Sequence, residues 1–534
     1  MISSKDDTIL QESPISKFVN LQPSVANKTR PVYKTEVVIK EKQNNLIPAF
    51  ILVIIAMSYY FLHTNLNIYY EDDSWTLSNA WNLMVHGVDK DLIFLDQDGA
   101  FTGQLFGKLY FITIGSFLNL VGWSKSNAFL FNSSLVMLAA WVWHSVLKEL
   151  KFSKKVVQFL PLFIPIFPPV FFAAHTGRTD AFTFLLMSIG ILLFVKKHYV
   201  PACLVAILAI ESHIMGVVTL FYYAAYFLSQ QTELKLSRPI KSSLSIIRSN
   251  SKILIECGIG AVIGIGLYMM LHFQTFDLQA LTEIIKSKSN MVSPVNNYIL
   301  AYFTDFDWIH HLPEFGLLAT TVYLYSKEKL YRKNKFLFFL LLLLVLSTLI
   351  TRRENRNYFI YLAPCVLMLY FYTFSQIKKT GLLVGALATI CIVYFSSIYY
   401  KNHDFKFDQF VSFVQDNTKA DIPIVGMPDV WFAATDKEYY PIHNERDFNK
   451  IELEEFYLIE TDYLSRRSRV YTDIKDNIHS NYDCKKTSEW VTYDGNTAAV
   501  CHCKNDGIPN KDIIYKPYPG WRTVMKNFMP SASL

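Results

Sequence analysis

Long apolar runs, separated by short polar segments, fill the chain between residues 47 and 400. A transmembrane helix needs about 20 predominantly apolar residues. The pattern predicts a polytopic bundle of about 11 spans, although 199–210 is short enough to require tilting or burial among neighbours. The predicted spans are 47–66, 126–147, 156–174, 181–195, 199–210, 213–228, 253–272, 312–326, 336–350, 358–375 and 381–400.

One further apolar stretch, 102–122, carries Gly107, Lys108 and Gly115. We interpret it as an amphipathic helix at the membrane interface. If it were a twelfth span, the sidedness of every later loop would be inverted.

The distribution of cationic residues favours 11 spans. Loops on one side hold 18 Lys and Arg residues, and the longer loops on the other side hold 9. Cytoplasmic loops are the ones enriched in Lys and Arg. The N-terminus is therefore predicted to be cytoplasmic, and residues 401–534 external.

Composition supports this assignment. Of the 534 residues, 51% are hydrophobic and only 18% charged, whereas soluble domains carry roughly a quarter charged residues. The net charge of +6 is small for this length and predicts no nucleic-acid partner. The sequence thus predicts a mainly α, multi-pass integral membrane protein in contact with the lipid bilayer.

Three regions follow from these patterns. We predict a cytoplasmic tail at 1–46, a transmembrane domain at 47–400 with a large outer loop at 67–125, and a small external α/β domain at 401–534. In the last region, 422–426 and 456–459 are predicted strands, and 487–493 with 497–502 a predicted hairpin.

Three cysteines lie outside the predicted spans. An external compartment permits a disulfide, and Cys484 is predicted to pair with Cys501 or Cys503, which leaves one thiol over. Metal binding by Cys501, His502 and Cys503 is the alternative.

Candidate catalytic residues open the first outer loop, where Glu71, Asp72 and Asp73 are adjacent. Adjacent acids repel, so one of them could keep a raised pKa and act as a general base. A solvated acidic loop end is the simpler interpretation. No particular cofactor and no metal site is predicted here, and a divalent cation at Asp73 is left as an alternative.

Candidate anion-binding residues occur in two other outer loops. Arg178 and Asp180 precede the span at 181–195, either as a simple ion pair or as an arginine that Asp180 holds toward an anionic headgroup. Arginine forks bind phosphate bidentately. The second set is Arg352, Arg353, Arg356 and Tyr358. His213, in a polar interruption beside Glu211, is either a supporting residue or the tip of a helical hairpin.

Together these residues resemble the GT-C superfamily of polytopic glycosyltransferases. The closest branch includes the protein O-mannosyltransferases and the lipid A aminoarabinose transferases. The resemblance covers about 47–400 and rests on the order of its motifs: Asp72 and Asp73 with Trp75, the stretch 82–87, the interfacial helix, Arg178 with Asp180, His213 with Gly216, and Arg356 and Tyr358 with Pro364.

The sequence departs from the family pattern at three places. Thr179 stands where a proline is usual, Asn357 separates an Arg and a Tyr that are usually adjacent, and the usual Asp-Glu pair is Asp-Asp. The last departure leaves open which of the three acids is the base.

The resemblance implies an inverting transfer of a sugar from a polyprenyl-phosphate donor to a glycan, lipid or protein acceptor at the periplasmic or lumenal face. A bacterial inner membrane or an ER-type membrane would be the location. The alternatives are a transporter or flippase of a phosphate-bearing lipid, which needs no catalytic acid, and a non-catalytic receptor or assembly protein acting through 401–534.

Overall fold

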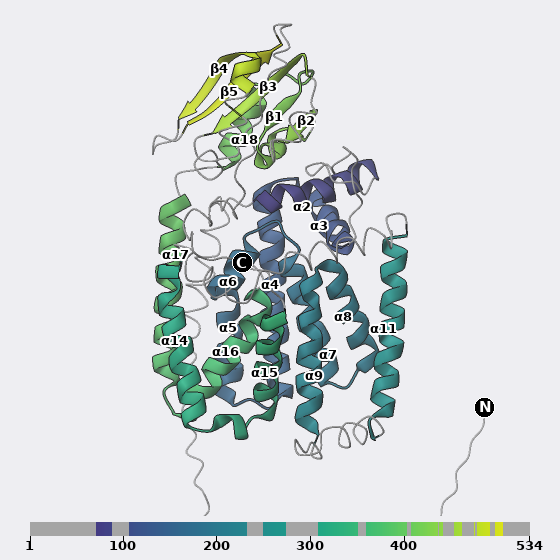
Figure 1. Ribbon diagram of the computed structural model, residues 1–534, viewed down its shortest axis with the longest axis vertical. Coiled ribbons are helices and arrows are strands. Elements are labelled where there is room, and N and C mark those ends of the chain that lie inside the picture. Colours follow the sequence, from purple (N-terminus) through teal and green to yellow (C-terminus); the bar gives the residue numbers. More distant parts are fainter. Residues whose placement is uncertain are drawn as a thin grey trace, which may run out of the picture. The chain divides into compact units, whose positions relative to one another are not determined.

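The structure, a computed structural model, describes residues 71–87, 106–231, 249–273, 308–350, 359–402, 407–435, 437–441, 453–461, 475, 478–491 and 497–505. Helices dominate up to residue 416, and strands follow (Figure 1). The helical elements are α2 (Glu71–Trp81), η1 (Asn82–His86), α3 (Lys108–Val121), α4 (Lys125–Glu149), α5 (Lys154–Ile166), α6 (Pro168–Ala174), α7 (Asp180–Val195), α8 (Tyr199–Ser212), η2 (Ile214–Val217), α9 (Val218–Gln230), α11 (Ser251–Leu271), α14 (Trp308–Lys327), η3 (Leu330–Arg332), α15 (Lys335–Ile350), α16 (Phe359–Gln376), α17 (Thr380–Asn402), α18 (Phe407–Asp416) and η5 (Pro428–Ala433).

Helices occupy every predicted span after the first, and the first, 47–66, lies outside the described residues. One predicted span, 156–174, is broken into α5 and α6 at Phe167, because Pro168 cannot continue the hydrogen bonds of the preceding helix. By length and composition α4 and α11 could each cross a membrane, and the structure holds several shorter apolar helices.

Lysines end four helices of the bundle. Lys151, Lys197, Lys329 and Lys378 follow α4, α7, α14 and α16, each with φ between 49° and 65°. A left-handed residue commonly ends a helix, and a cation there faces the negative end of the helix dipole. The alternating helix directions bring these four ends to one end of the bundle (Figure 1). Four of the cation-rich loops that were predicted to share one side therefore lie at the same end of the bundle.

Helix α11 packs against α8 through two buried glycines. A Cβ on Gly260 would lie 2.2 Å from the Val200 carbonyl oxygen, and one on Gly264 would lie 2.7 Å from Ile207 Cβ. Small residues permit this kind of close helix contact in membranes. The rest of α11 is largely exposed, including Ile255 and Met270. An apolar helix with so little protein contact is typical of a surface covered by lipid.

The C-terminal region is a five-stranded mixed sheet with the order β2-β1-β3-β5-β4. Parallel pairs join β1 to β2 and β3, and antiparallel pairs join β5 to β3 and β4. The predicted hairpin is thus confirmed as β4–β5, whereas β2 was not predicted. The strands are β1 (Ile424–Gly426), β2 (Tyr439–Pro441), β3 (Glu455–Thr461), β4 (Asp483–Val491) and β5 (Thr497–Lys504).

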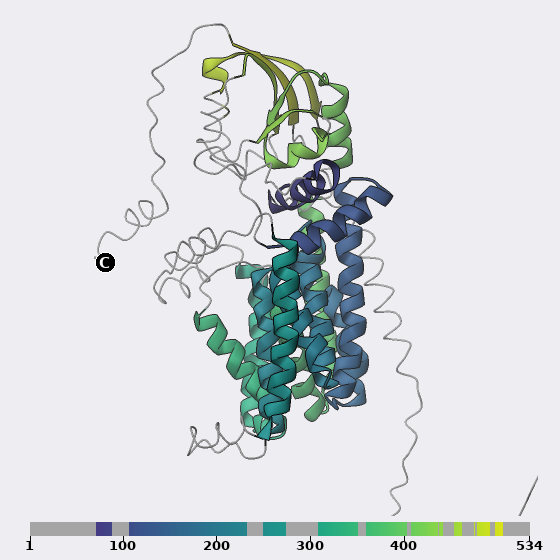
Figure 2. The ribbon, with the colours of Figure 1, turned by 90° about the vertical axis from the view of Figure 1, so that its right-hand side faces the viewer.

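The two faces of this sheet are covered differently. Phe410 of α18 packs with Tyr457 and Val500 on one face, and Figure 2 shows α18 against the twisted sheet. Ile478 packs with Leu458 on the other face. This alternation is the period of two that a strand imposes on its side chains.

A disulfide joins Cys484 of β4 to Cys503 of β5, which are directly opposed in the antiparallel register. This is one of the two predicted pairings. Cys501 is the thiol left over, and it is buried.

Candidate active site

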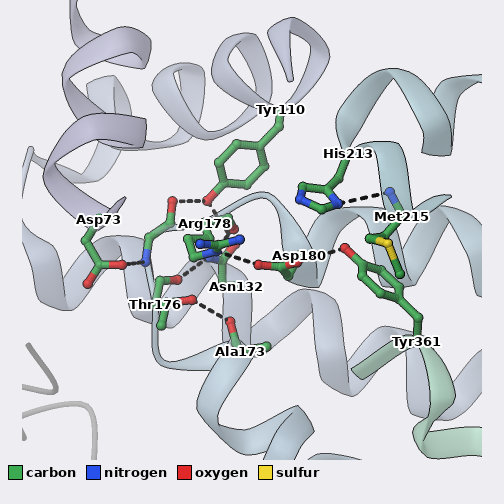
Figure 3. A network of polar contacts seen from close by, with 11 residues as sticks. Asp73, Tyr110, Asn132, Ala173, Thr176, Arg178, Asp180, His213, Met215 and Tyr361 are labelled. Atoms are coloured by element: carbon green, nitrogen blue, oxygen red, sulfur yellow. Dashed lines mark hydrogen bonds and ion pairs between the residues drawn. The ribbon is translucent and has the colours of Figure 1, made fainter. Parts of the chain in front are cut away.

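The acidic trio forms the first turn of α2. The side chains of Glu71 and Asp72 lie outside the described residues, whereas that of Asp73 is completely buried. Asp73 Oδ1 accepts a 2.6 Å hydrogen bond from the backbone N–H of Gly177, and Oδ2 lies 3.3 Å from Lys125 Nζ. One carboxylate therefore connects α2 with the start of α4 and with the loop that precedes α7. Figure 3 shows its bond to the loop.

Lys125 lies between two carboxylates. Its Nζ is 3.3 Å from Asp73 and 3.8 Å from Oδ2 of Asp429, which belongs to η5 in the C-terminal region. Ser74 donates a 2.8 Å hydrogen bond to Asp429 Oδ1. All four side chains are buried, at 3% relative exposure or less. The lysine supplies positive charge between the two carboxylates, and Asp429 brings the C-terminal region into the site.

Burial raises the pKa of Asp73 from its ordinary value of 3.8 to about 7. Lys125 lowers the pKa, but less than burial raises it, and the nearby Asp429 carboxylate raises it further. A carboxyl group that titrates near neutral pH in a buried setting is typical of functional sites.

The loop before α7 forms the second half of the site. Arg178 Nε donates a 2.7 Å hydrogen bond to Asp180 Oδ2, and Tyr361 of α16 donates a 2.9 Å bond to Asp180 Oδ1. Arg178 is 7% exposed and Asp180 is completely buried. The pairing that the sequence suggested for Arg178 and Asp180 is therefore present, and Tyr361 of α16 also holds the carboxylate (Figure 3).

Buried side chains hold the backbone of this loop. Asn132 of α4 donates to the carbonyl oxygens of Thr176 and Arg178, and Tyr110 of α3 donates a 2.9 Å bond to that of Gly177. A Cβ on Gly177 would lie 2.9 Å from Leu77 Cδ1, so a larger residue here would displace the buried Leu77 side chain of α2. The site is thus built by α2, α3, α4, α7 and α16 together.

His213 lies at the edge of this network. Its Nδ1 accepts a 3.1 Å hydrogen bond from Met215 N–H at the start of η2, and its ring stacks on Tyr361 with centroids 6.1 Å apart. The residue caps the returning helix and also lies against Tyr361, the hydrogen-bond partner of Asp180. Its supporting role in the site stays a prediction.

Glu211, two residues earlier, belongs to a separate buried pair. Its Oε1 lies 3.0 Å from His272 Nε2 at the end of α11, and it also accepts a 3.2 Å hydrogen bond from Leu109 N–H. Both the Glu211 and the His272 side chains are fully buried.

Arg352, Arg353, Arg356 and Tyr358 lie outside the described residues. Tyr361, three positions after Tyr358, is described and reaches Asp180. The shared location of Arg178 and Arg356 remains a prediction.

Sequence reasoning missed several residues of the network. Asn132 carries a detectable signal, because an amide inside a long apolar run needs partners. In the sequence Lys125 is one of the nine cations of the outer loops, and Tyr110 and Tyr361 resemble ordinary aromatic residues of apolar helices. Asp429 has no local signal, since its partners are more than 300 residues away along the chain.

No protein-family model and no curated protein matches this sequence. Solved structures do match. The crystal structure of ArnT from Cupriavidus metallidurans bound to undecaprenyl phosphate aligns with a TM-score of 0.55 and 10% identity, over 85% of this chain and 98% of ArnT. The apo crystal structure of the same protein aligns with a TM-score of 0.52 at the same identity and coverage.

ArnT is a lipid A aminoarabinose transferase with the GT-C fold. The match extends over nearly its whole chain, so the GT-C-like fold that the motifs predicted is confirmed. At 10% identity the likeness concerns the fold.

Proposed function

We propose that this protein is an integral-membrane glycosyltransferase that moves a sugar from a polyprenyl-phosphate donor to an acceptor at the outer membrane face. The observation that carries the proposal is the buried network joining Asp73 of α2 to Arg178 before α7 through Gly177. It places an acidic helix start beside an arginine, in a fold whose crystallised neighbour holds undecaprenyl phosphate.

Asp72 is the proposed general base. Neighbouring residues of a helix point in different directions, so the three acids cannot all face one substrate. Asp73 is engaged by Gly177 and Lys125, which makes it a positioning residue in this proposal. Asp72 is then the first candidate for the general base, and Glu71 is the second.

The proposed reaction inverts the configuration of the sugar. The acceptor oxygen forms a bond to the anomeric carbon while its proton passes to the Asp72 carboxylate. The bond between that carbon and the phosphate oxygen breaks, and polyprenyl phosphate leaves with the electron pair. Cations at the leaving phosphate would stabilise the charge that develops there.

Arg178 and Arg356 are the proposed phosphate ligands, with Arg352, Arg353 and Tyr358 in support. For Arg178, the 2.7 Å bond to Asp180 fixes the Nε edge of the guanidinium. An arginine held in this way loses little conformational freedom when it binds an anion.

The remaining assignments complete the proposal. The N-terminus is cytoplasmic, residues 401–534 are periplasmic or lumenal, and the acceptor is a glycan, a lipid or a protein. The clustering of the lysine-ended helices at one end of the bundle supports this sidedness.

A transporter or flippase of a phosphate-bearing lipid is the second candidate. The observation in its favour is the Glu211–His272 pair, completely buried between α8 and α11. Buried ionisable pairs between the helices of a membrane protein are candidates for a transport pathway.

Turnover in detergent distinguishes the two candidates. Purified protein is supplied with a panel of undecaprenyl-phosphate sugars and candidate acceptors, and products are followed by mass spectrometry. A transferase releases undecaprenyl phosphate and a glycosylated acceptor, whereas a transporter leaves the lipid chemically unchanged. Movement of a lipid between the leaflets of proteoliposomes without conversion of any donor would contradict the transferase proposal.

A further inference from the structure

Three potential metal ligands converge on one face of the C-terminal sheet. They are Glu460 of β3, Cys501 of β5 and His479 of the helical turn 478–481. One ligand atom from each residue lies within 4.8 Å of those of the other two. Nothing in the proposed transferase reaction uses them.

Strand geometry explains why these residues meet. In the β3–β5 register Leu458 opposes Cys501, and Glu460 opposes Ala499 one step further along the same face. Ile478 is buried against that face, which anchors the turn carrying His479. The carboxylate, thiol and imidazole therefore come from three segments that the fold holds together.

The motif Cys501-His502-Cys503 does not form the site that its spacing suggested. Cys503 is bonded to Cys484, and the His502 ring lies against that of Tyr457, a residue of the opposite face. Only Cys501 is available from this motif. Its partners, Glu460 and His479, are distant in sequence, so no local sequence pattern predicts them.

The ligand types favour a zinc-like ion. Thiolate and imidazole ligands select borderline or soft transition metals over Mg²⁺ and Ca²⁺. Zinc sites with three protein ligands keep a fourth position for water, and His479 is 36% exposed, which gives solvent access from its side.

Charge also suits a divalent ion. A Glu460 carboxylate and a Cys501 thiolate together supply two negative charges, while His479 can bind as the neutral ring. Lys475 Nζ lies 3.0 Å from Glu460 Oε2, and the other oxygen, Oε1, hydrogen-bonds His479. A metal ion would take the place of the proton in that hydrogen bond and leave the lysine contact intact.

A thiol binds metal as the thiolate. Metal binding therefore releases the thiol proton to solvent, so affinity should increase with pH.

We propose that Glu460, His479 and Cys501 bind one zinc-like divalent ion, with water as the fourth ligand. The ion links β3, β5 and the turn at 478–481. It stabilises the face of the sheet that also carries the Cys484–Cys503 disulfide. This site is independent of the proposed sugar transfer.

Cobalt binding to the full-length protein tests the proposal. Protein purified in detergent with a histidine-free tag is stripped with a chelator and titrated with Co²⁺. Wild type should bind one equivalent and show a thiolate-to-cobalt charge-transfer band. Cys501→Ser should remove the band, and Cys501→Ser and His479→Ala should each weaken binding more than about 10-fold, since even outer-shell partners contribute that much.

Two controls keep the outcome interpretable. His502→Ala changes a histidine on the same strand but on the opposite face, and should bind Co²⁺ like wild type. Peptide mass mapping without reduction shows whether the Cys484–Cys503 bond is intact in every variant. Absence of stoichiometric Co²⁺ from folded wild type, or binding that survives both Cys501→Ser and His479→Ala, would overturn the proposal.

Discussion

Asp73 and Asp180 are both completely buried carboxylates, yet their surroundings differ. Asp180 accepts a 2.7 Å bond from Arg178 and a 2.9 Å bond from Tyr361, one on each oxygen. Asp73 Oδ1 accepts a hydrogen bond from the Gly177 N–H. Its Oδ2 lies 3.3 Å from Lys125 Nζ and accepts no well-aligned hydrogen bond from any described residue.

Asp180 is therefore a structural carboxylate, whereas Asp73 is a carboxyl group that can gain or lose its proton near neutral pH. Asp180 is fully paired with an arginine, which cannot lose its proton in a protein. Asp73 shares its lysine with Asp429 and titrates near pH 7. The carboxylate at the start of α7 is thus fixed by two partners, whereas the Asp73 carboxyl of α2 can change its protonation state near neutral pH. The proposed base, Asp72, is the residue next to it.

The largest predicted effect on the free energy of unfolding is at Asp180. Asp180→Asn leaves the buried Arg178 guanidinium without its counter-charge, which should destabilise the protein by about 3–5 kcal/mol. Thermal unfolding in detergent measures it. The exposed Asp408→Asn is the matched control and should stay within about 0.5 kcal/mol of wild type. An unfolding temperature for Asp180→Asn equal to that of the control would contradict the structural role.

Lys125→Met should lower the free energy of unfolding by less, about 1–3 kcal/mol, which is the cost of one unsatisfied buried polar group. Without Lys125, Asp73 can take up a proton and become neutral. Arg178 without Asp180 cannot become neutral, because arginine does not lose its proton in a protein. Lys148→Met, at the exposed end of the same helix α4, is the control. If Lys125→Met proved more destabilising than Asp180→Asn, the contrast between the two carboxylates would be wrong.

The structure of this network could be predicted only in part from sequence. Apolar run length located the helices from α4 to α17, because the bilayer demands about 20 apolar residues of any span. Local polar motifs located Asp73, Arg178, Asp180 and His213. Lys125 and Asp429 were missed because their significance comes from a contact across more than 300 residues, for which a single sequence holds no periodic signal.

Asp429→Asn should produce a smaller change, about 0.5–1.5 kcal/mol, because an asparagine oxygen can still accept the Ser74 hydrogen bond. Removal of its negative charge should also lower the pKa of Asp73, which Asp429 now raises. Unfolding temperatures across pH, compared with wild type, report both effects. An unchanged pH dependence would show that the C-terminal region does not influence the acid of α2.

The pH dependence of stability tests the raised pKa of Asp73 itself. Because the pKa of Asp73 is about 7 in the folded protein and 3.8 ordinarily, the folded state keeps a proton that the unfolded chain has lost between these values. The contribution of Asp73 to stability therefore falls as pH rises from about 4 to about 7. Asp73→Asn, which does not titrate, should gain in unfolding temperature relative to wild type over this range. A constant difference between the two proteins would contradict the raised pKa.

The most direct test of the central claim compares sugar transfer in Asp72→Asn and wild type, with donor binding measured on the same samples. Asp98→Asn, in the same outer loop, is the control. The variant should bind undecaprenyl-phosphate sugar normally but transfer it about 10²–10⁴-fold more slowly, since the substituted amide cannot accept the acceptor proton. Wild-type transfer by Asp72→Asn, with Glu71→Gln and Asp73→Asn also active, would contradict catalysis by an acid of α2.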